Sequence, residues 1–416
     1  MSRKVGLGID VLTAARERIS YVFDEFPRIY VSFSGGKDST VMLHLVMEEA
    51  IKRRRSVGVL FVDMEAQYGL TVSHALEMHK LYSPFSEWFW VCLPIVLRNA
   101  VSAYEPRWQC WDPDKRSIWV RPPPPIAISD LSYFPFFKRG MEFEEFVPEF
   151  GKWYATRGLP QKSFENTACF IGIRTQESLN RHLKLAVRQH REFYKNRMWL
   201  LRQKSTQLGI YSTHPIYDWC TEDIWTYHAK HFKPYNKLYD LMHKAGVSIH
   251  EQRICQPYGE EQRKGLWMYH IIEPETWAKV IARVNGANSG AEFVQLSGNI
   301  SGRLKITLPD GHTWQSFAML ILESLPESLQ THYKNKIAVF LKWYRERGYP
   351  DGIPDQVDHA DETAKTKPSW RRICKMMLRN DYFAKGLSFD QTKPEYYIRY
   401  IKVMANRRRK WGIFPS

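Results

Sequence analysis

The sequence of 416 residues lacks closely spaced cysteines and long apolar runs. Its six cysteines are scattered, without a Cys-x-x-Cys pair. This excludes zinc ribbons, disulfide scaffolds and clusters built on paired cysteines, so we expect no iron–sulfur cluster. No apolar run approaches the roughly 18 residues that cross a bilayer, and no apolar signal core stands at the N-terminus. We therefore expect a cytoplasmic protein without a membrane contact.

The sequence also has too few acidic residues to balance its basic ones. Lys and Arg number 60 against 44 Asp and Glu, which leaves a formal net charge of +16. Such a balance favours anionic ligands. A bound nucleotide would account for part of the excess, and a nucleic acid or an acidic protein partner is a second use for the rest.

The Walker loop is absent, because no Gly-Lys-Ser or Gly-Lys-Thr occurs. In its place stands Ser34-Gly35-Gly36-Lys37-Asp38-Ser39. A buried strand is predicted over 29–33, directly before this loop, and an amphipathic helix follows it. The pattern indicates a strand, a glycine turn and a helix N-terminus, which together form a phosphate site.

Each residue type in this loop suits a phosphate group. Gly35 and Gly36 allow positive φ, so that backbone N–H groups turn toward a ligand. Lys37 supplies a point charge, and Asp38 suits a Mg²⁺ ion bound through substrate phosphates. Lys37 and Asp38 are therefore catalytic candidates, and Asp38 is the candidate metal ligand. The predicted nucleotide contacts in this stretch are Phe33, Ser34, Gly35, Gly36, Lys37, Asp38, Ser39 and Thr40.

Residues 57–65 predict a second buried strand, which ends in Asp63 and Glu65. Ligands bind at the carboxyl ends of parallel strands that are joined by a helix, so both carboxylates are candidate nucleotide contacts. The alternative is that they only cap a helix predicted over 68–82. The following residues 83–135 are rich in Trp and Pro, and their aromatic side chains either stack on a base or simply pack.

A second strand-to-turn unit covers residues 168–181. Gly172 allows close backbone approach, and Arg174 offers a planar set of donors for phosphate or sulfate. Glu177 is expected to fix Arg174 or Arg181 by charge-assisted hydrogen bonds. Taken alone, an ordinary surface ion-pair cluster explains these residues equally well.

A third stretch covers residues 212–240, with Pro215-Ile216-Tyr217-Asp218-Trp219 before a predicted helix. Asp218 is a candidate nucleotide contact. Its alternative role is to shape the turn before that helix.

These three stretches resemble the PP-loop of the adenine nucleotide alpha-hydrolase superfamily and, within it, the phosphoadenosine phosphosulfate reductase family. The likeness covers about residues 25–260. It implies that residues 34–39 bind nucleotide phosphates and that Asp63 lies near the ribose or adenine. It further implies that Arg174 and Arg181 bind phosphate or sulfate oxygens.

One departure from that family concerns its chemistry. Reductases of the family carry a C-terminal Glu-Cys-Gly-Leu-His nucleophile or paired cysteines, and neither occurs here. Sulfonucleotide reduction needs a thiolate that attacks sulfur. Cys255 is either a substitute nucleophile or a structural thiol.

The character of the sequence changes at about residue 285. Residues 304–314 predict a small hairpin, and helical patterns return over 315–347 and 368–385. This part resembles the uncharacterised C-terminal domain appended to reductase-like proteins of bacterial and prophage origin. Members include a prophage co-activator of immunoglobulin-binding protein expression, which travels with a ParB-like partner. The basic stretch at 407–410 is either a phosphate-backbone contact or a solvated tail.

We therefore expect an α/β parallel-sheet nucleotide-binding domain over residues 1–284 and a mainly helical, basic domain over 285–416. The first functional hypothesis is a transferase-like enzyme that binds ATP with Mg²⁺ and breaks the α–β phosphate bond. Catalysis would rest on positioning and charge stabilisation by Lys37, Asp38 and Arg174. The alternatives are a nucleotide-dependent regulator or phage-defence component that binds DNA or a partner, and a thiol-dependent sulfonucleotide reductase.

Overall fold

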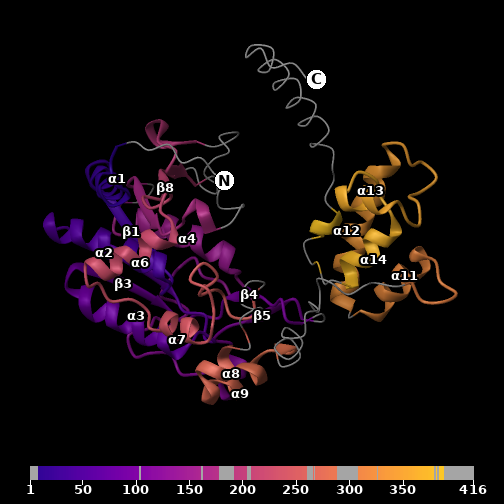
Figure 1. Cartoon of the computed structure of the whole chain (residues 1–416), viewed down its shortest axis with the longest axis horizontal. Helices are drawn as coiled ribbons and strands as arrows, with labels where there is room; N and C mark the ends of the chain where they lie inside the picture. The colour runs from indigo at the N-terminus through magenta and orange to yellow at the C-terminus, as the bar shows by residue number, and fades with distance from the viewer. Residues whose placement is uncertain are drawn as a thin grey trace, which may run out of the picture. The chain divides into compact units, whose positions relative to one another are not determined.

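The structure is a computed structural model (Figure 1). It describes residues 8–102, 105–160, 163–177, 192–203, 208–259, 266, 268–287, 308–325, 327–378, 381 and 384–387. By its contacts the chain divides into two compact units. Unit 1 comprises residues 1–101 and 107–291, and unit 2 comprises residues 102–106 and 292–416.

Unit 1 is built on a six-stranded sheet of order β3-β2-β1-β6-β8-β7. Its five strands β3, β2, β1, β6 and β8 run parallel, and only the edge strand β7 is antiparallel to its neighbour. The strands are β1 (Arg28–Phe33), β2 (Val57–Val62), β3 (Ser86–Val91), β6 (Thr167–Ile171), β7 (Leu200–Arg202) and β8 (Ile210–Thr213), and a separate antiparallel pair is formed by β4 (Val96–Arg98) and β5 (Arg107–Gln109). The helices are α1 (Val11–Glu25), α2 (Lys37–Lys52), α3 (Gly69–Tyr82), α4 (Phe143–Thr156), α6 (Thr221–Lys230), α7 (Leu238–Lys244), α8 (Met268–Ile272) and α9 (Pro274–Arg283).

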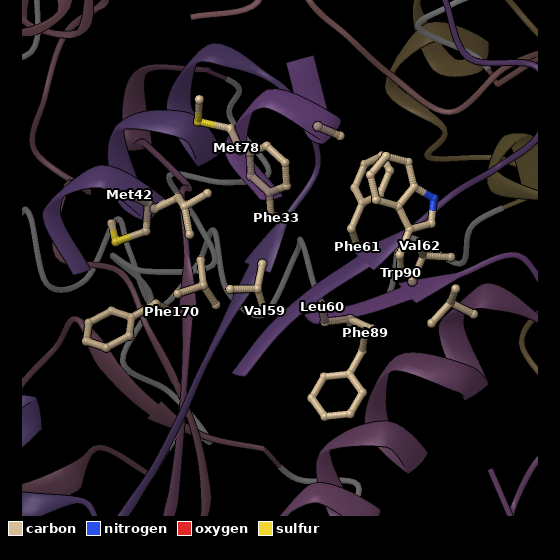
Figure 2. Packing of buried hydrophobic residues seen from close by; sticks show 14 of the residues in the cluster. Phe33, Met42, Val59, Leu60, Phe61, Val62, Met78, Phe89, Trp90 and Phe170 are labelled. Atoms are coloured by element: carbon tan, nitrogen blue, oxygen red, sulfur yellow. The ribbon is translucent and has the colours of Figure 1, made fainter. Parts of the chain in front are cut away.

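Apolar side chains cover both faces of this sheet. Tyr30 and Phe89 contact Phe150 of α4, with ring centroids 5.3 Å and 5.2 Å apart. On the other face Phe33 lies against Phe61 and against His74 of α3. Figure 2 shows Phe89 pointing away from Phe33 and Phe61. Because both faces are buried, the central strands are apolar along most of their length, which is how parallel sheets read in a sequence.

The elements predicted in the first part of the chain are confirmed. The strands at 29–33 and 57–62 pair in parallel through α2, as a right-handed crossover requires. A helix occurs close to the predicted position at α3. The α/β class with a mainly parallel sheet follows directly from this order of elements.

Unit 2 is helical in its described residues. It contains α11 (Trp314–Ser324), α12 (Glu327–Arg345), α13 (His359–Ala364) and α14 (Trp370–Leu378), packed around an apolar cluster that includes Tyr333, Phe340 and Ile373. The predicted hairpin over 304–314 is wrong at its second strand. Thr313 caps α11 by accepting a hydrogen bond from Ser316 N, and this side-chain acceptor favours a helix start over a strand. Residues 304–307 lie outside the described residues.

No helix in the described parts of the chain has both the length and the apolar character that crossing a membrane requires.

Candidate functional site

The loop between β1 and α2 is shaped by glycine. Gly35 has a φ of +74°, and a methyl group on its Cα would lie 2.8 Å from Cγ2 of Thr71. Gly36 is the N-cap residue of α2 and, as a glycine, has no side chain to cap this helix end. A side chain at position 35 is therefore excluded by both conformation and space, and the first turn of α2 begins at Lys37, whose N–H donates to Tyr239 Oη at 3.0 Å.

Hydroxyl groups hold this loop in shape. Ser39 Oγ donates to Gly36 O at 2.9 Å and lies 3.0 Å from Ser34 Oγ. Thr40 is fully buried, with Oγ1 2.9 Å from Gly36 O and 3.0 Å from Nε2 of His74. The hydroxyl of Thr40 therefore also contacts α3 through His74. The hydroxyl groups of Ser34 and Ser39 contact each other within the loop.

Two cations and one carboxylate meet at the N-terminus of α2. Arg174 Nε donates to Asp38 Oδ1 at 2.5 Å, and Lys37 Nζ lies 3.5 Å from Asp38 Oδ2. Arg174 comes from the turn after β6, the strand that pairs with β1 on the side opposite β2. Lys37 and Arg174 are 3% and 2% exposed. The group carries a net charge of +1 in buried surroundings, where the positive end of the α2 dipole adds to it.

Burial lowers the pKa of Lys37, an effect that the charge of Asp38 opposes and that of Arg174 reinforces. The Lys37 ammonium donates to the backbone O of Gln252 at 3.0 Å and lies 5.3 Å from the ring centre of Tyr239. An anion bound here would restore charge balance and favour the protonated amine.

Gly172 and Glu177 position Arg174. A methyl group on Gly172 would lie 2.7 Å from the backbone O of Asp38, so the β6 turn touches the loop only because residue 172 is glycine. Glu177 Oε2 accepts from the backbone N of Arg174 at 3.2 Å. Arg181, the other predicted oxyanion ligand of this stretch, lies outside the described residues.

Two residues at this site were not predicted from the sequence to take part in it. Tyr239 is buried, and its hydroxyl accepts from Lys37 N at 3.0 Å. Asn236 Nδ2 donates to Gly35 O and to Thr71 Oγ1, both at 3.0 Å. Both belong to the stretch Pro234-Tyr235-Asn236-Lys237-Leu238-Tyr239. In the sequence, these are two polar residues beside a short helix. Such a local pattern does not reveal that their partners lie about 200 positions earlier in the chain.

Asp63 lies at the carboxyl end of β2 and is fully buried. Its Oδ2 accepts from Trp90 Nε1 at 2.9 Å, and its Oδ1 accepts from Arg121 Nη2 at 2.5 Å and from Glu65 N at 3.0 Å. The strand-end position expected for Asp63 is therefore present. Trp90 and Trp111, from the Trp-rich stretch, are also buried here, and Trp111 Nε1 donates to Asp63 O at 2.7 Å.

Glu65 is engaged entirely by the protein. Arg283 donates to its two carboxylate oxygens from Nε at 2.6 Å and Nη2 at 3.0 Å, and Trp111 N and Val120 N donate at 2.6 Å and 3.1 Å. A carboxylate with four such donors has little acceptor capacity left for a ligand. The alternative that Asp63 and Glu65 cap the next helix is wrong, because Glu273 accepts from Gly69 N and Leu70 N at the start of α3.

Asp218 forms a two-point ion pair with Arg18 of α1. Arg18 Nη1 and Nη2 donate to Oδ1 and Oδ2 of Asp218 at 2.9 Å and 2.7 Å. Arg18 also donates to Pro215 O at 2.6 Å and lies 4.7 Å from the ring centre of Tyr217. This geometry supports the turn-shaping alternative for Asp218.

The described residues contain no group of three or more His, Cys, Asp or Glu side chains placed to hold a metal ion. Asp38, the predicted metal ligand, is the carboxylate that lies at the start of α2. The Cys255 thiol is partly buried. It lies near Tyr239, whose pKa its charge would raise.

Two family descriptions match the sequence. The phosphoadenosine phosphosulfate reductase domain matches residues 28–86 and 139–246. The domain of unknown function DUF3440 matches residues 246–357, so its first part lies in unit 1 and includes α8 and α9. Residues 87–138, here called the 87–138 segment, lie between the two matched parts of the reductase domain.

Three solved structures illustrate the structural comparison. Phosphoadenylyl-sulfate reductase of Candida auris, in a phosphate complex, has a TM-score of 0.28 at 13% identity and covers 58% of this chain and 94% of its own. FMN adenylyltransferase of Candida glabrata, in complex with FAD and inorganic pyrophosphate, has a TM-score of 0.32 at 13% identity. The match covers 57% of this chain and 63% of that enzyme. The U34-tRNA thiolase NcsA of Methanococcus maripaludis, with its [4Fe-4S] cluster, has a TM-score of 0.30 at 13% identity. The match covers 72% of this chain and 86% of NcsA.

Two curated proteins are similar in sequence, and both are uncharacterised. MJ0066 of Methanocaldococcus jannaschii is 24% identical over 243 residues, which cover 54% of this chain and 37% of that protein. YbdN of Escherichia coli strain K12 is 43% identical over 411 residues, which cover 99% of this chain and 98% of YbdN. The sequence matches a phosphoadenosine phosphosulfate reductase domain followed by DUF3440, and the chain belongs to the family of YbdN.

Proposed function

We propose that the chain binds the phosphates of an adenine nucleotide at residues 34–39. The observation that carries this proposal is the convergence of Lys37 and Arg174 on the N-terminus of α2, with one carboxylate between them. Two buried cations with a single anion leave an unbalanced positive charge, which an anion would neutralise. The match to a phosphoadenosine phosphosulfate reductase domain supports an adenine nucleotide as that anion.

The proposed reaction is cleavage of ATP between its α- and β-phosphates, with AMP passing to water or to an acceptor. Attack on the α-phosphorus breaks its bond to pyrophosphate, and the negative charge that develops on the leaving group lies near Lys37 and the N–H groups of α2. Arg174 would stabilise charge on the α-phosphate or orient the acceptor. A bound Mg²⁺ would neutralise phosphate charge, and Asp38 is the residue that would hold it.

Asp38 can serve this role because its present partners are cations that phosphates also attract. When phosphate oxygens draw Lys37 and Arg174, the carboxylate is released to a metal ion without moving far. Asp63 remains a proposed neighbour of the nucleoside, whereas Glu65 and Asp218 are proposed to hold the architecture, because Arg283 and Arg18 engage them. DNA, a ParB-like partner and a prophage origin stay predictions from the sequence.

The test is calorimetric titration with ATP, AMP and 3′-phosphoadenosine phosphosulfate in the presence of Mg²⁺, followed by product analysis. Lys37→Ala should weaken ATP binding at least about tenfold, since a charge-assisted hydrogen bond contributes roughly 1.5–3 kcal/mol. Lys52→Ala is the control, because Lys52 lies at the other end of α2 with its side chain 74% exposed. Pyrophosphate among the products supports the proposed reaction.

Three results would reject parts of this proposal. ADP instead of pyrophosphate would reject α–β cleavage. Thiol-dependent release of sulfite from 3′-phosphoadenosine phosphosulfate, lost in Cys255→Ser, would show a reductase instead. Absence of any nucleotide binding would show that the loop serves the fold alone.

A further inference from the structure

The 87–138 segment brings an arginine to the carboxyl end of β2. Arg121 donates from Nη2 to Oδ1 of Asp63 at 2.5 Å, and its guanidinium carbon lies 5.2 Å from the ring centre of Trp111. The reductase domain matches residues 28–86 and 139–246 and therefore does not include this segment. Arg121 thus lies outside the matched reductase domain, at the edge of the sheet where residues 34–39 also lie.

Arg121 retains donors that the protein does not use. Its Nε and Nη1 atoms are buried, and within the described residues neither has a hydrogen-bond partner. An unsatisfied buried donor costs free energy, more so on a charged group. In the β2–α3 loop, Gln67 is 6% exposed, and its buried Oε1 likewise has no partner among the described residues. This edge therefore offers spare donors and a spare acceptor.

The position of Arg121 suits the nucleoside end of a bound nucleotide. β1 and β2 are adjacent parallel strands, so their carboxyl ends are about 4.8 Å apart. A nucleoside whose phosphates sit on the α2 N-terminus is long enough to reach past β2. On the other side of β1, Arg174 is already paired with Asp38 and suits charged oxygens.

The charges at Arg121 argue against a phosphate as its ligand. Asp63 is fully buried beside the guanidinium and balances its charge. A phosphate bound here would face a buried carboxylate at short range, and like charges in a low-dielectric site repel strongly. Uncharged acceptor atoms, such as a ring nitrogen or a ribose oxygen, satisfy the free N–H groups without that repulsion.

We propose that Arg121 is a specificity-determining residue that binds uncharged acceptor atoms of the nucleoside and, through its pairing with Asp63, disfavours nucleotides with a 3′-phosphate. This inference rests on the proposed function, because it needs phosphates bound at residues 34–39. It deepens that function by assigning the substrate to 5′-nucleotides without a 3′-phosphate.

The experiment compares ligands with and without a nucleoside. Calorimetric titrations with ATP and with inorganic tripolyphosphate, both with Mg²⁺, are made on the full chain, Arg121→Gln and Arg121→Lys. Both variants should lose at least about tenfold in ATP affinity while their tripolyphosphate affinity stays within twofold. Arg116→Gln is the matched control, because Arg116 lies in the same segment and is exposed; it should change neither affinity.

A second comparison uses AMP and 3′-phosphoadenosine 5′-phosphate. The wild type should bind AMP more tightly, and Asp63→Asn should reduce that preference because it removes the repelling charge. Arg121→Lys keeps a cation beside Asp63. If Arg121→Gln fails to fold, the ATP and tripolyphosphate affinities of Arg121→Lys test the proposal.

Several outcomes would overturn the inference while leaving the phosphate site intact. They are an equal loss of ATP and tripolyphosphate binding in both Arg121 variants, no loss of either, or tighter binding of the 3′-phosphorylated ligand by the wild type. If the wild type binds neither ATP nor tripolyphosphate, the proposed function fails and this inference fails with it.

Discussion

Arg174 Nε and Asp38 Oδ1 lie 2.5 Å apart, although 136 positions separate the two residues in the sequence. Arg174 follows β6 and Asp38 lies at the start of α2, so this ion pair joins the turn after β6 to the loop after the neighbouring strand β1. The approach is possible because Gly172 presents no side chain to the backbone of Asp38. The first prediction tests this close approach.

Gly172→Ala should damage the site more than the fold. The added methyl group would lie 2.7 Å from Asp38 O and 2.8 Å from Ser39 N, so the β6 turn and the α2 N-terminus must separate. We expect ATP affinity to fall at least about tenfold by calorimetry, because a displacement near 1 Å has a large effect on a positioned site. Circular dichroism should remain close to that of the wild type.

The control is Gly158→Ala. Gly158 has a φ of +70° and no atom within 4 Å of an added methyl group, so only conformational strain of about 1 kcal/mol is expected, without a change in ATP affinity. An unchanged ATP affinity in Gly172→Ala would contradict the close approach as a requirement of the site.

Arg283→Met should strongly destabilise unit 1. The variant leaves the fully buried Glu65 carboxylate without its cation, which costs about 3–5 kcal/mol for a buried pair. Urea denaturation measures the free energy of unfolding, and the double variant Glu65→Gln/Arg283→Met should lose clearly less than the sum of the two single variants.

The matched control for that ion pair is Arg139→Met. Arg139 pairs with Asp114 at the surface, with side chains 60% and 71% exposed, so the change should cost less than about 1 kcal/mol. Similar losses in Arg139→Met and Arg283→Met would show that burial of the Glu65 pair has no special effect.

Asp218→Asn should lower stability and leave nucleotide binding unchanged. The substitution weakens the two-point pair with Arg18, which is partly buried, and a loss of about 1–3 kcal/mol is expected in urea denaturation. ATP affinity should stay within twofold. A tenfold loss of ATP affinity at unchanged stability would instead place Asp218 in the nucleotide site.

The free energy of unfolding should fall between about pH 6.5 and pH 4. Burial lowers the pKa of His44 to about 3 and those of His74 and His228 to about 4, from 6.5. In this window the unfolded chain binds protons that the folded chain does not, so each histidine reduces stability by up to about 1.4 kcal/mol per pH unit as the pH falls. Urea denaturation at pH 7.5 and pH 5.5 measures the difference.

His44→Gln should reduce this pH dependence. His44 lies with Nδ1 2.6 Å from Tyr82 Oη and Nε2 2.9 Å from Pro234 O, and an amide can replace part of this hydrogen bonding without titrating. The variant is expected to be less stable at pH 7.5 but to lose less on acidification. A wild type equally stable at pH 7.5 and pH 5.5 would contradict the expectation.

The order of elements in unit 1 could be predicted because its signals are local. An apolar run, two glycines and a helical pattern occur within 20 residues, and they indicate β1, the loop and α2 by backbone preferences alone. Asp63 and Arg174 were also predictable as strand-end residues, because parallel strands joined by crossovers end at the same edge. The second strand of the hairpin predicted before α11 is wrong, since a turn motif does not distinguish a following strand from a capped helix.

The sequence by itself determined β1, the loop over residues 34–36 and α2, together with the residue types of that loop. The tertiary structure decided the partners. Glu65 and Arg283 are 218 positions apart, and Tyr239 contacts Lys37 N across 202 positions. Arg121 reaches Asp63 from a segment in which the sequence indicated only aromatic stacking or packing. Such contacts depend on which strand ends and loops the completed sheet brings together. A local pattern of charge or hydrophobicity does not indicate which distant residues will meet.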